Sequence, residues 1–160
     1  MILDEKLELC DATSVALTAG ATVQNVGDII DLDAARDIGN GEPLYFVVTV
    51  DTEIITGGNA GTITFQLVSD STDTIATNGT QTVHYRSHAF VTDGTDANAA
   101  ELKAGKVPVC VALPVQGIPY ERYLAVQVFV LTTDTTAGKI NAFITKDPTG
   151  WKAYPNATNA

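Results

Sequence analysis

The stretch that decides the fold is LYFVVTVD, residues 44–51. Side chains of an extended chain alternate between two faces, so this stretch divides into two sets. Leu44, Phe46, Val48 and Val50 form the apolar set, and Tyr45, Val47 and Thr49 form the other. A period of two with many β-branched residues predicts a β-strand whose apolar set faces a core.

The same alternation recurs along the chain. It is clear in residues 62–70, 107–113, 122–131 and 140–145, and weaker in 28–32, 80–87 and 99–102. Turn signals rich in Gly, Asn and Asp separate these segments, and only residues 4–9 and 33–37 have a helix-like pattern. Apolar residues on both faces of 122–131 indicate a central strand that is covered on both sides. We therefore predict an all-β protein, an antiparallel β-sandwich or jelly roll of seven to eight strands.

The chain of 160 residues is the size of one domain, which we place at residues 1–160. An N-terminal arm, residues 1–12, carries Ile2, Leu3, Leu7 and Leu9 ahead of the first clear strand. These apolar residues either pad the sandwich or dock on a neighbouring molecule, and the sequence favours neither reading. Residues 147–160 follow the last strand and are predicted to form a C-terminal tail.

Composition argues against several classes of partner. Nineteen acidic residues against nine basic ones give a net charge of −10, which disfavours binding to nucleic acid. No stretch reaches the roughly 18 consecutive apolar residues of a membrane helix. The acidic start of the chain lacks the basic region of a signal peptide, so we expect synthesis in a cytoplasm. Cys10 and Cys110 are then expected to be buried, reduced thiols rather than a disulfide.

The residues that could carry catalysis do not form a recognisable set. His84 and His88 lie on a predicted strand, where a spacing of four keeps them apart, and no third His or nearby Glu completes a cupin-like metal site. The segment DGTDAN, residues 93–98, lacks the glycine of a calcium loop. No GxSxG or phosphate-binding loop is present. We predict no enzyme activity, no metal and no cofactor.

A long charged connection, residues 33–44, leads into the strongest strand. Arg36 is flanked there by Asp33 and Asp37. Arg36 could form a local salt-bridge cluster of little energetic value, or it could anchor an interface, where arginine is enriched.

Several segments are similar to a known family. They are AARDIGNGEPLY (residues 34–45), TITFQLVSDS (62–71), IPYERYLAVQVFV (118–130) and ITKDPTGWKAYPNA (144–157). In this order they resemble the capsid cement proteins of short-tailed bacteriophages, of the type first described in a Bordetella phage. The resemblance runs from Met1 to about Asn156, with residues 78–106 departing most.

The resemblance implies a jelly-roll subunit without enzymatic activity on the outer surface of the virion, made in the cytoplasm of a bacterial host. Such proteins bind the major capsid protein as homodimers at two-fold positions. We predict the contacts to the capsid or the second copy in the arm and the charged connection, at Ile2, Leu3, Leu7, Arg36, Asp37, Asn40 and Glu42.

A carbohydrate-binding jelly-roll module of a phage tail or surface protein is the alternative. It would need an exposed aromatic platform, for which Tyr120, Trp151 and Tyr154 are the candidates. A cupin-like metalloenzyme using the two histidines is a third reading.

Overall fold

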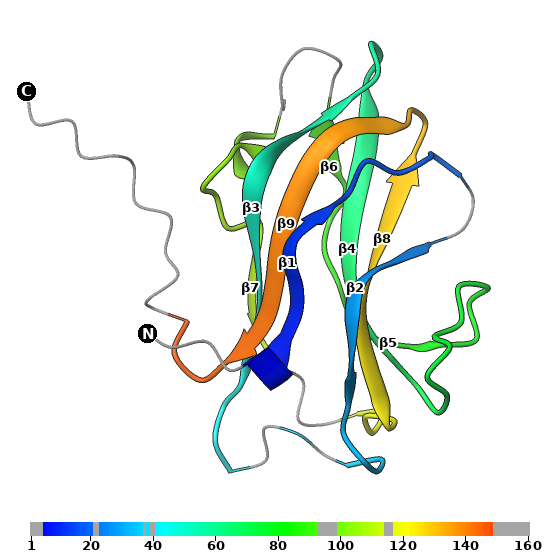
Figure 1. The fold of residues 1–160 in the computed structure, drawn as a ribbon, viewed down its shortest axis with the longest axis vertical. Coiled ribbons are helices and arrows are strands. Elements are labelled where there is room, and N and C mark those ends of the chain that lie inside the picture. The colour runs from blue at the N-terminus through cyan, green and yellow to red at the C-terminus, as the bar shows by residue number, and fades with distance from the viewer. Residues whose placement is uncertain are drawn as a thin grey trace, which may run out of the picture.

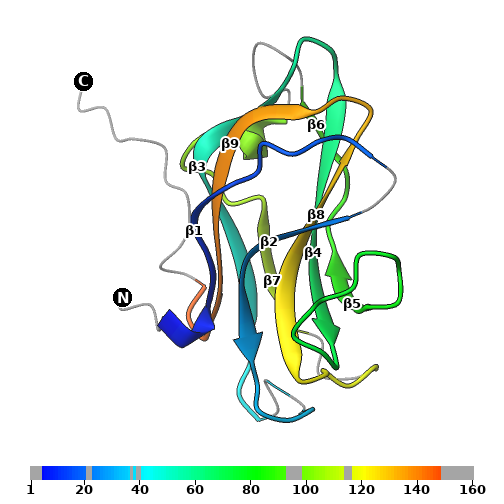
Figure 2. The ribbon, with the colours of Figure 1, turned by 45° about the vertical axis from the view of Figure 1, so that its right-hand side comes forward.

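Two antiparallel β-sheets face each other in the computed structural model (Figures 1 and 2). The structure describes residues 5–20, 23–36, 38, 41–92, 99–113 and 117–148. Its elements are η1 (Glu5–Leu7), β1 (Glu8–Ser14), β2 (Gln24–Asp31), β3 (Tyr45–Thr56), β4 (Gly61–Asp70), β5 (Thr82–Arg86), β6 (Phe90–Thr92), η2 (Ala100–Leu102), β7 (Val109–Ala112), β8 (Tyr123–Leu131) and β9 (Thr135–Thr145), where η denotes a 3-10 helix.

The strand order is that of a jelly roll. One sheet runs β1-β9-β3-β7 and the other β2-β8-β4-β5, with β6 also pairing with β4. The antiparallel pairs β1–β9, β2–β8, β3–β7 and β4–β5 are those of one long hairpin folded over on itself. Strands β5 and β6 pair with different parts of the same β4 edge and so share one position. The predicted all-β sandwich is confirmed, with nine strands instead of seven or eight.

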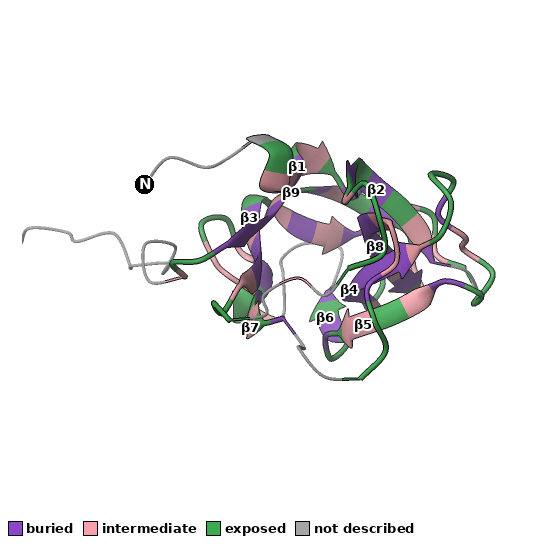
Figure 3. Ribbon diagram, turned by 90° about the horizontal axis from the view of Figure 1, so that it is seen from below, coloured by how far each residue is buried: buried purple, intermediate pink, exposed green. Residues whose placement is uncertain are grey.

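The core lies between the sheets and follows the predicted alternation (Figure 3). Phe46, Val48 and Val50 of β3 are buried there, as expected for the apolar set of residues 44–51. Val47 is buried too, on the other face, where it pairs with Phe143 of β9 and Cys110 of β7. A central strand therefore buries a residue that alternation alone assigned to the outside.

The predicted N-terminal arm differs from the structure in its second half. Residues 8–14 form β1, an edge strand paired with β9, and Leu9 and Cys10 are both buried in the core. Two bulges interrupt this pairing, and Ala12, with φ of 42°, donates its backbone N–H to Asn141 Oδ1 at 2.6 Å. Because bulges break the period of two, the pattern that reveals other strands is lost here.

Smaller differences have local causes. Residues 99–102, a weak strand prediction, contain the 3-10 helix η2, and the three-residue strand β6 is too short for alternation to reveal. Strand β9 begins at Thr135, five residues before the predicted start. Among the described residues, no helix combines the length and apolar character needed to cross a membrane.

One glycine allows the two sheets to close along the side where β1 and β2 meet. Gly27 has φ of +73°, and a Cβ at this position would lie 2.0 Å from Leu9 O. Cys10 lies beside it, and burial raises the pKa of this thiol to about 12, so it stays protonated at neutral pH. Both cysteines are free, but the expectation of two buried thiols is wrong for Cys110, which is exposed on β7.

Candidate functional site

One end of the sandwich collects most of the described residues predicted to form an interface. The register places the start of β1 beside the end of β9, and the end of β2 beside the start of β8. The 3-10 helix η1, the described parts of the connection 32–44 and the connections 117–122 and 146–148 therefore lie at the same end, the lower one in Figure 1. We call this the lower end.

Apolar residues attach these segments to the sandwich. Leu7, Leu32, Ile38 and Leu44 are half-buried and pack against the core. Of the two readings of the arm, padding of the sandwich therefore applies to Leu7. The connection therefore contacts the core at residues 32, 38 and 44, while Asp33, Arg36 and Glu42 between these points are exposed.

Two of the predicted charged residues have different surroundings. Arg36 is exposed and makes no ion pair with the part of the chain that the structure describes. Glu42 pairs with Lys146 at the end of β9, and both side chains are 65% exposed. Such an exposed pair stabilises a protein by at most about 1 kcal/mol. Ile2, Leu3, Asp37 and Asn40 lie outside the described residues.

A second ion pair holds the start of the charged connection. Arg122 donates from Nε and Nη2 to the two carboxylate oxygens of Asp31, each at 2.8 Å. The Asp33 backbone N–H also donates to Asp31, at 2.7 Å. These hydrogen bonds, that from Arg122 first, lower the pKa of Asp31 to about 2. Asp33 has φ of 67°, so the chain turns sharply where the connection begins.

The lower end also carries an apolar residue that sequence reasoning missed. Ile118 is 68% exposed, the largest exposure among the large hydrophobic residues of the described chain. It lies between Gly117 and Pro119, and an apolar residue in a Gly-X-Pro turn was the only available signal. Ile118 and Arg36 together give the lower end an apolar and a cationic contact point.

The two histidines lie in separate environments. His84 Nε2 is 2.7 Å from Ser69 Oγ, and its ring stacks on Tyr120 with centroids 4.0 Å apart. Burial lowers the pKa of His84. His88 is exposed and lies against Phe90, at 4.0 Å between ring centroids. In the described parts of the chain, no three His, Cys, Asp or Glu residues are grouped to hold a metal ion.

The Ser69–His84 pair does not have the geometry of an activated nucleophile. Ser69 is completely buried, and its Oγ accepts the Glu121 backbone N–H at 3.1 Å. The Glu121 carboxylate lies 3.5 Å from Ser69 Oγ, whereas a nucleophile–base–acid triad would place it on the histidine. We interpret the cluster as a structural one that connects β4, β5 and the 117–122 connection.

The predicted aromatic platform is not available at Tyr120. This side chain is 1% exposed and stacked on His84, so it cannot offer a ring face to a sugar. Trp151 and Tyr154 lie beyond the residues that the structure describes.

A polar row crosses the outer face of the second sheet, and no sequence signal indicated it. Register aligns Arg86, Gln66, Gln127 and Asn25, on β5, β4, β8 and β2 respectively. We call these four residues the outer row. Gln66 and Gln127 are completely buried although they face away from the core.

The connection 71–81 covers part of this row. Gln127 Nε2 donates to Asn25 Oδ1 at 2.8 Å and to Ala76 O at 2.7 Å, and its Oε1 accepts from Gln81 Nε2 at 2.9 Å. Ile75 of the same connection packs in a small apolar cluster with Val68 and Ala125. Hydrogen bonds and apolar contacts thus hold residues 71–81 against the sheet.

The strand order and the two facing sheets define the class of protein, a jelly-roll β-sandwich. The family model described as Bbp16 matches residues 11–144, and the chain therefore belongs to the Bbp16 family. The family name suggests a Bordetella phage protein, in agreement with the phage resemblance of residues 34–45. No curated protein matches the chain.

Proposed function

We propose that this protein is a structural virion protein, a capsid cement or decoration protein. In this role it binds the outer surface of the phage head and stabilises contacts between major capsid protein subunits. The observation that carries the proposal is the Bbp16 match over residues 11–144, taken with the resemblance of residues 34–45 to phage cement proteins. The jelly-roll sandwich is the fold that the resemblance implies.

Physical considerations support such a role. DNA packed in a phage head presses outward, and a protein bound across subunit boundaries resists their separation. Many copies of one modest contact sum on a symmetric lattice, so each contact need not be strong. A net charge of −10 favours solubility at high concentration and disfavours contact with nucleic acid.

The lower end is the proposed contact surface. Ile118 and Arg36 supply an exposed apolar side chain and a cation without an ion pair among the described residues. The buried core of a protein interface is largely apolar, and arginine is enriched at interfaces. The predicted contributions of Ile2, Leu3, Asp37, Asn40 and Glu42 remain part of this proposal, as does binding as a homodimer at two-fold positions.

Co-sedimentation with purified, expanded phage shells tests the proposal. The wild-type chain is expected to pellet with shells and not to bind free major capsid protein. Ile118→Ser and Arg36→Gln should each lower the bound fraction, because each removes a contact at the lower end. Val91→Ser on β6 and Lys139→Gln on β9 are the matched controls away from the lower end, and they should bind like wild type.

Two outcomes would contradict the proposal. Failure of the wild-type chain to pellet with shells would exclude a cement role. Equal binding by all four variants would leave the role intact but would exclude the lower end as the contact surface. Circular dichroism of each variant checks that the fold is retained, which we expect because the four side chains are exposed.

A further inference from the structure

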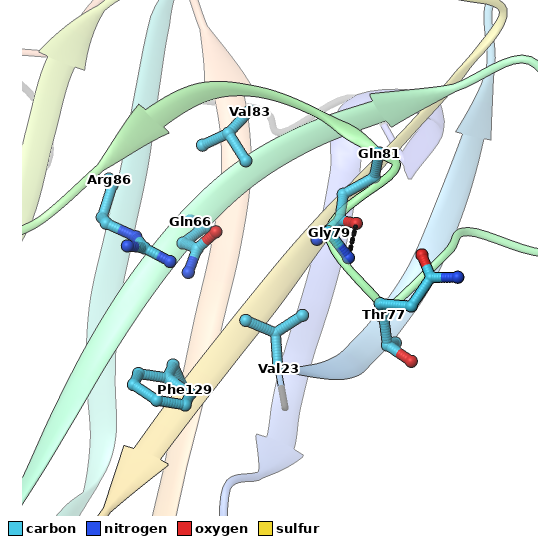
Figure 4. Close-up of a pocket in the computed structure, with 9 residues that line it drawn as sticks. Val23, Gln66, Thr77, Gly79, Gln81, Val83, Arg86 and Phe129 are labelled. Atoms are coloured by element: carbon cyan, nitrogen blue, oxygen red, sulfur yellow. Dashed lines mark hydrogen bonds between the residues drawn. The ribbon is translucent and has the colours of Figure 1, made fainter. Parts of the chain in front are cut away.

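A pocket of about 350 Å³ lies on the outer face of the second sheet, away from the lower-end contact residues (Figure 4). Its volume is within the usual range of ligand sites, roughly 300–1,000 Å³. Strands β4, β5 and β8 and the end of the 71–81 connection contribute its walls. The described lining residues are Val23, Gln66, Thr77, Asn78, Gly79, Gln81, Val83, Arg86 and Phe129.

A bulge in β5 creates one wall. Val83 and Arg86 are three residues apart and would point to opposite faces of a regular strand. The register shifts between the pairs Leu67↔Tyr85 and Val68↔Val83, so that both Val83 and Arg86 pair with outer-face residues of β4. Both side chains consequently line the same pocket, as Figure 4 shows. Bulges are frequent beside binding sites because they redirect a side chain in this way.

Arg86 is held by a buried amide. With its side-chain oxygen facing the guanidinium, Gln66 accepts hydrogen bonds from Arg86 Nε at 3.0 Å and from Arg86 Nη2 at 2.7 Å. Gln66 is completely buried, so its position is set by the sheet. This contact uses one side of the guanidinium and leaves Nη1 and the second hydrogen of Nη2 as a fork of donors. A guanidinium fork of this kind matches the two oxygens of a carboxylate.

Arg86 is the one charged residue among the nine described residues that line the pocket. None of the nine described lining residues is acidic, although the chain carries 19 acidic residues and a net charge of −10. The described ion pairs of the protein's arginines and lysines involve Arg122 and Lys146, not Arg86. Arg86 is thus oriented by an amide, has no carboxylate partner among the described residues, and can pair with the carboxylate of a ligand.

The remaining lining combines apolar side chains on both sides of the Arg86–Gln66 pair with a hydrogen-bonded loop at the rim. Val23, Val83 and Phe129 present aliphatic and aromatic surface, and Val83 is 42% exposed. Gly79, which also lines the pocket, donates its backbone N–H to Gln81 Oε1 at 3.0 Å, and this bond stabilises the loop at the rim. An apolar group that covers the exposed Val83 would gain about 25 cal/mol for each Å² removed from water.

We propose that this pocket binds an organic carboxylate whose acid group pairs with Arg86 and whose apolar body lies against Val23, Val83 and Phe129. The carboxylate can come from a small free acid or from an acidic side chain next to an apolar residue in another protein. Both sources present the same chemistry to the pocket. The inference does not depend on capsid binding, since none of its residues belongs to the lower end.

Calorimetric titration of the full-length chain with phenylacetate, and with phenylacetamide as the neutral match, tests the charge requirement. We expect the amide to bind about tenfold more weakly or worse, because a charge-assisted bidentate pair contributes about 1.5–3 kcal/mol. Arg86→Gln should cause the same loss for phenylacetate. Arg86→Lys should recover little of the affinity, since an ammonium lacks the fork. Arg36→Gln is the matched control and should bind like wild type.

A second variant keeps the test decisive if Arg86→Gln perturbs β5. Val83→Glu places a carboxylate at an exposed position beside Arg86, so it should abolish phenylacetate binding while the sandwich stays folded. A blocked leucyl-glutamate dipeptide and its neutral leucyl-glutamine counterpart distinguish the two possible sources of the carboxylate. Preferential binding of the acidic dipeptide supports a protein segment as ligand, and preferential binding of phenylacetate supports a free acid.

The proposal is overturned if neither acid binds better than its amide. It is also overturned if inorganic phosphate binds as tightly as phenylacetate, because the apolar wall would then be irrelevant. Either result leaves the shell-binding test unaffected, so failure of this inference and failure of the proposed function can be told apart.

Discussion

Two neighbouring rows of residues cross the second sheet, and both contain buried side chains in different chemical settings. The inner row, Tyr85, Leu67, Val126 and Val26, belongs to or packs against the hydrophobic core. The outer row is Arg86, Gln66, Gln127 and Asn25. Each of its residues is the sequence neighbour of one inner-row residue on the same strand and so points to the opposite face of the sheet. The inner row is stabilised by apolar burial, and the outer row by hydrogen bonds.

The difference shows how one sheet can serve two purposes. Apolar burial has no direction, so the inner row is expected to tolerate other apolar side chains of similar volume. Hydrogen bonds are directional, and a buried amide that loses its partner is costly. The outer row therefore holds Arg86 and the 71–81 connection in defined positions, which is what a binding pocket requires.

The largest effect is expected in the inner row. Leu67→Ala removes a completely buried side chain and leaves a cavity, which should lower the free energy of unfolding by about 3–5 kcal/mol. Urea unfolding measures it. Leu131→Ala on β8 is the control, since Leu131 is 45% exposed and should cost less than about 1 kcal/mol. Similar losses in the two variants would contradict the assignment of Leu67 to the core.

A substitution in the outer row is expected to lower the free energy of unfolding by less, because hydrogen bonds stabilise this row. Gln127→Leu keeps much of the volume but removes the bonds that Gln127 makes to Gln81 Nε2, Ala76 O and Asn25 Oδ1, and should lower the free energy of unfolding by about 2–3 kcal/mol. Hydrogen exchange should quicken in residues 71–81 while β3 and β9 stay protected. Gln24→Leu, which breaks a single surface bond to Thr18 O, is the matched control. An unchanged or raised stability for Gln127→Leu would mean that the outer row is not held by these bonds.

The smallest effect concerns His84, which lies at the β5 bulge next to Tyr85 of the inner row. Its pKa in the folded chain is below the ordinary value of 6.5 because burial disfavours the charged ring. Below about pH 6.5 the unfolded chain binds a proton that the folded chain takes up only at lower pH, so stability should fall as the pH drops. The contribution of neutral His84 to the free energy of unfolding is fully present above about pH 6.5.

Urea unfolding at a series of pH values measures how steeply the free energy of unfolding depends on pH. His84→Gln should flatten this slope, while His88→Gln should keep it, because replacing the exposed ring leaves the half-buried one in place. A slope that survives in His84→Gln and vanishes in His88→Gln would reverse the assignment.

Sequence reasoning located most of the sheet but little of either candidate site. Residues 44–51 and 62–70 have local alternation, so their core faces could be read directly. Strand β1 could not, because its bulges shift the pattern at Cys10 and Thr13. Arg36 and Glu42 were singled out by charge, whereas Ile118 and the outer row have no distinctive spacing and were missed.

The sequence by itself determined the all-β sandwich and its inner faces, because alternation and apolar burial are properties of each strand separately. Only the tertiary structure decided which side chains meet. Gln127 reaches Asn25 across 102 residues, and Arg122 reaches Asp31 across 91. Val83 and Arg86 share a pocket because of a bulge that depends on pairing with β4. Contacts of this kind follow from strand register and chain folding, which no local pattern encodes.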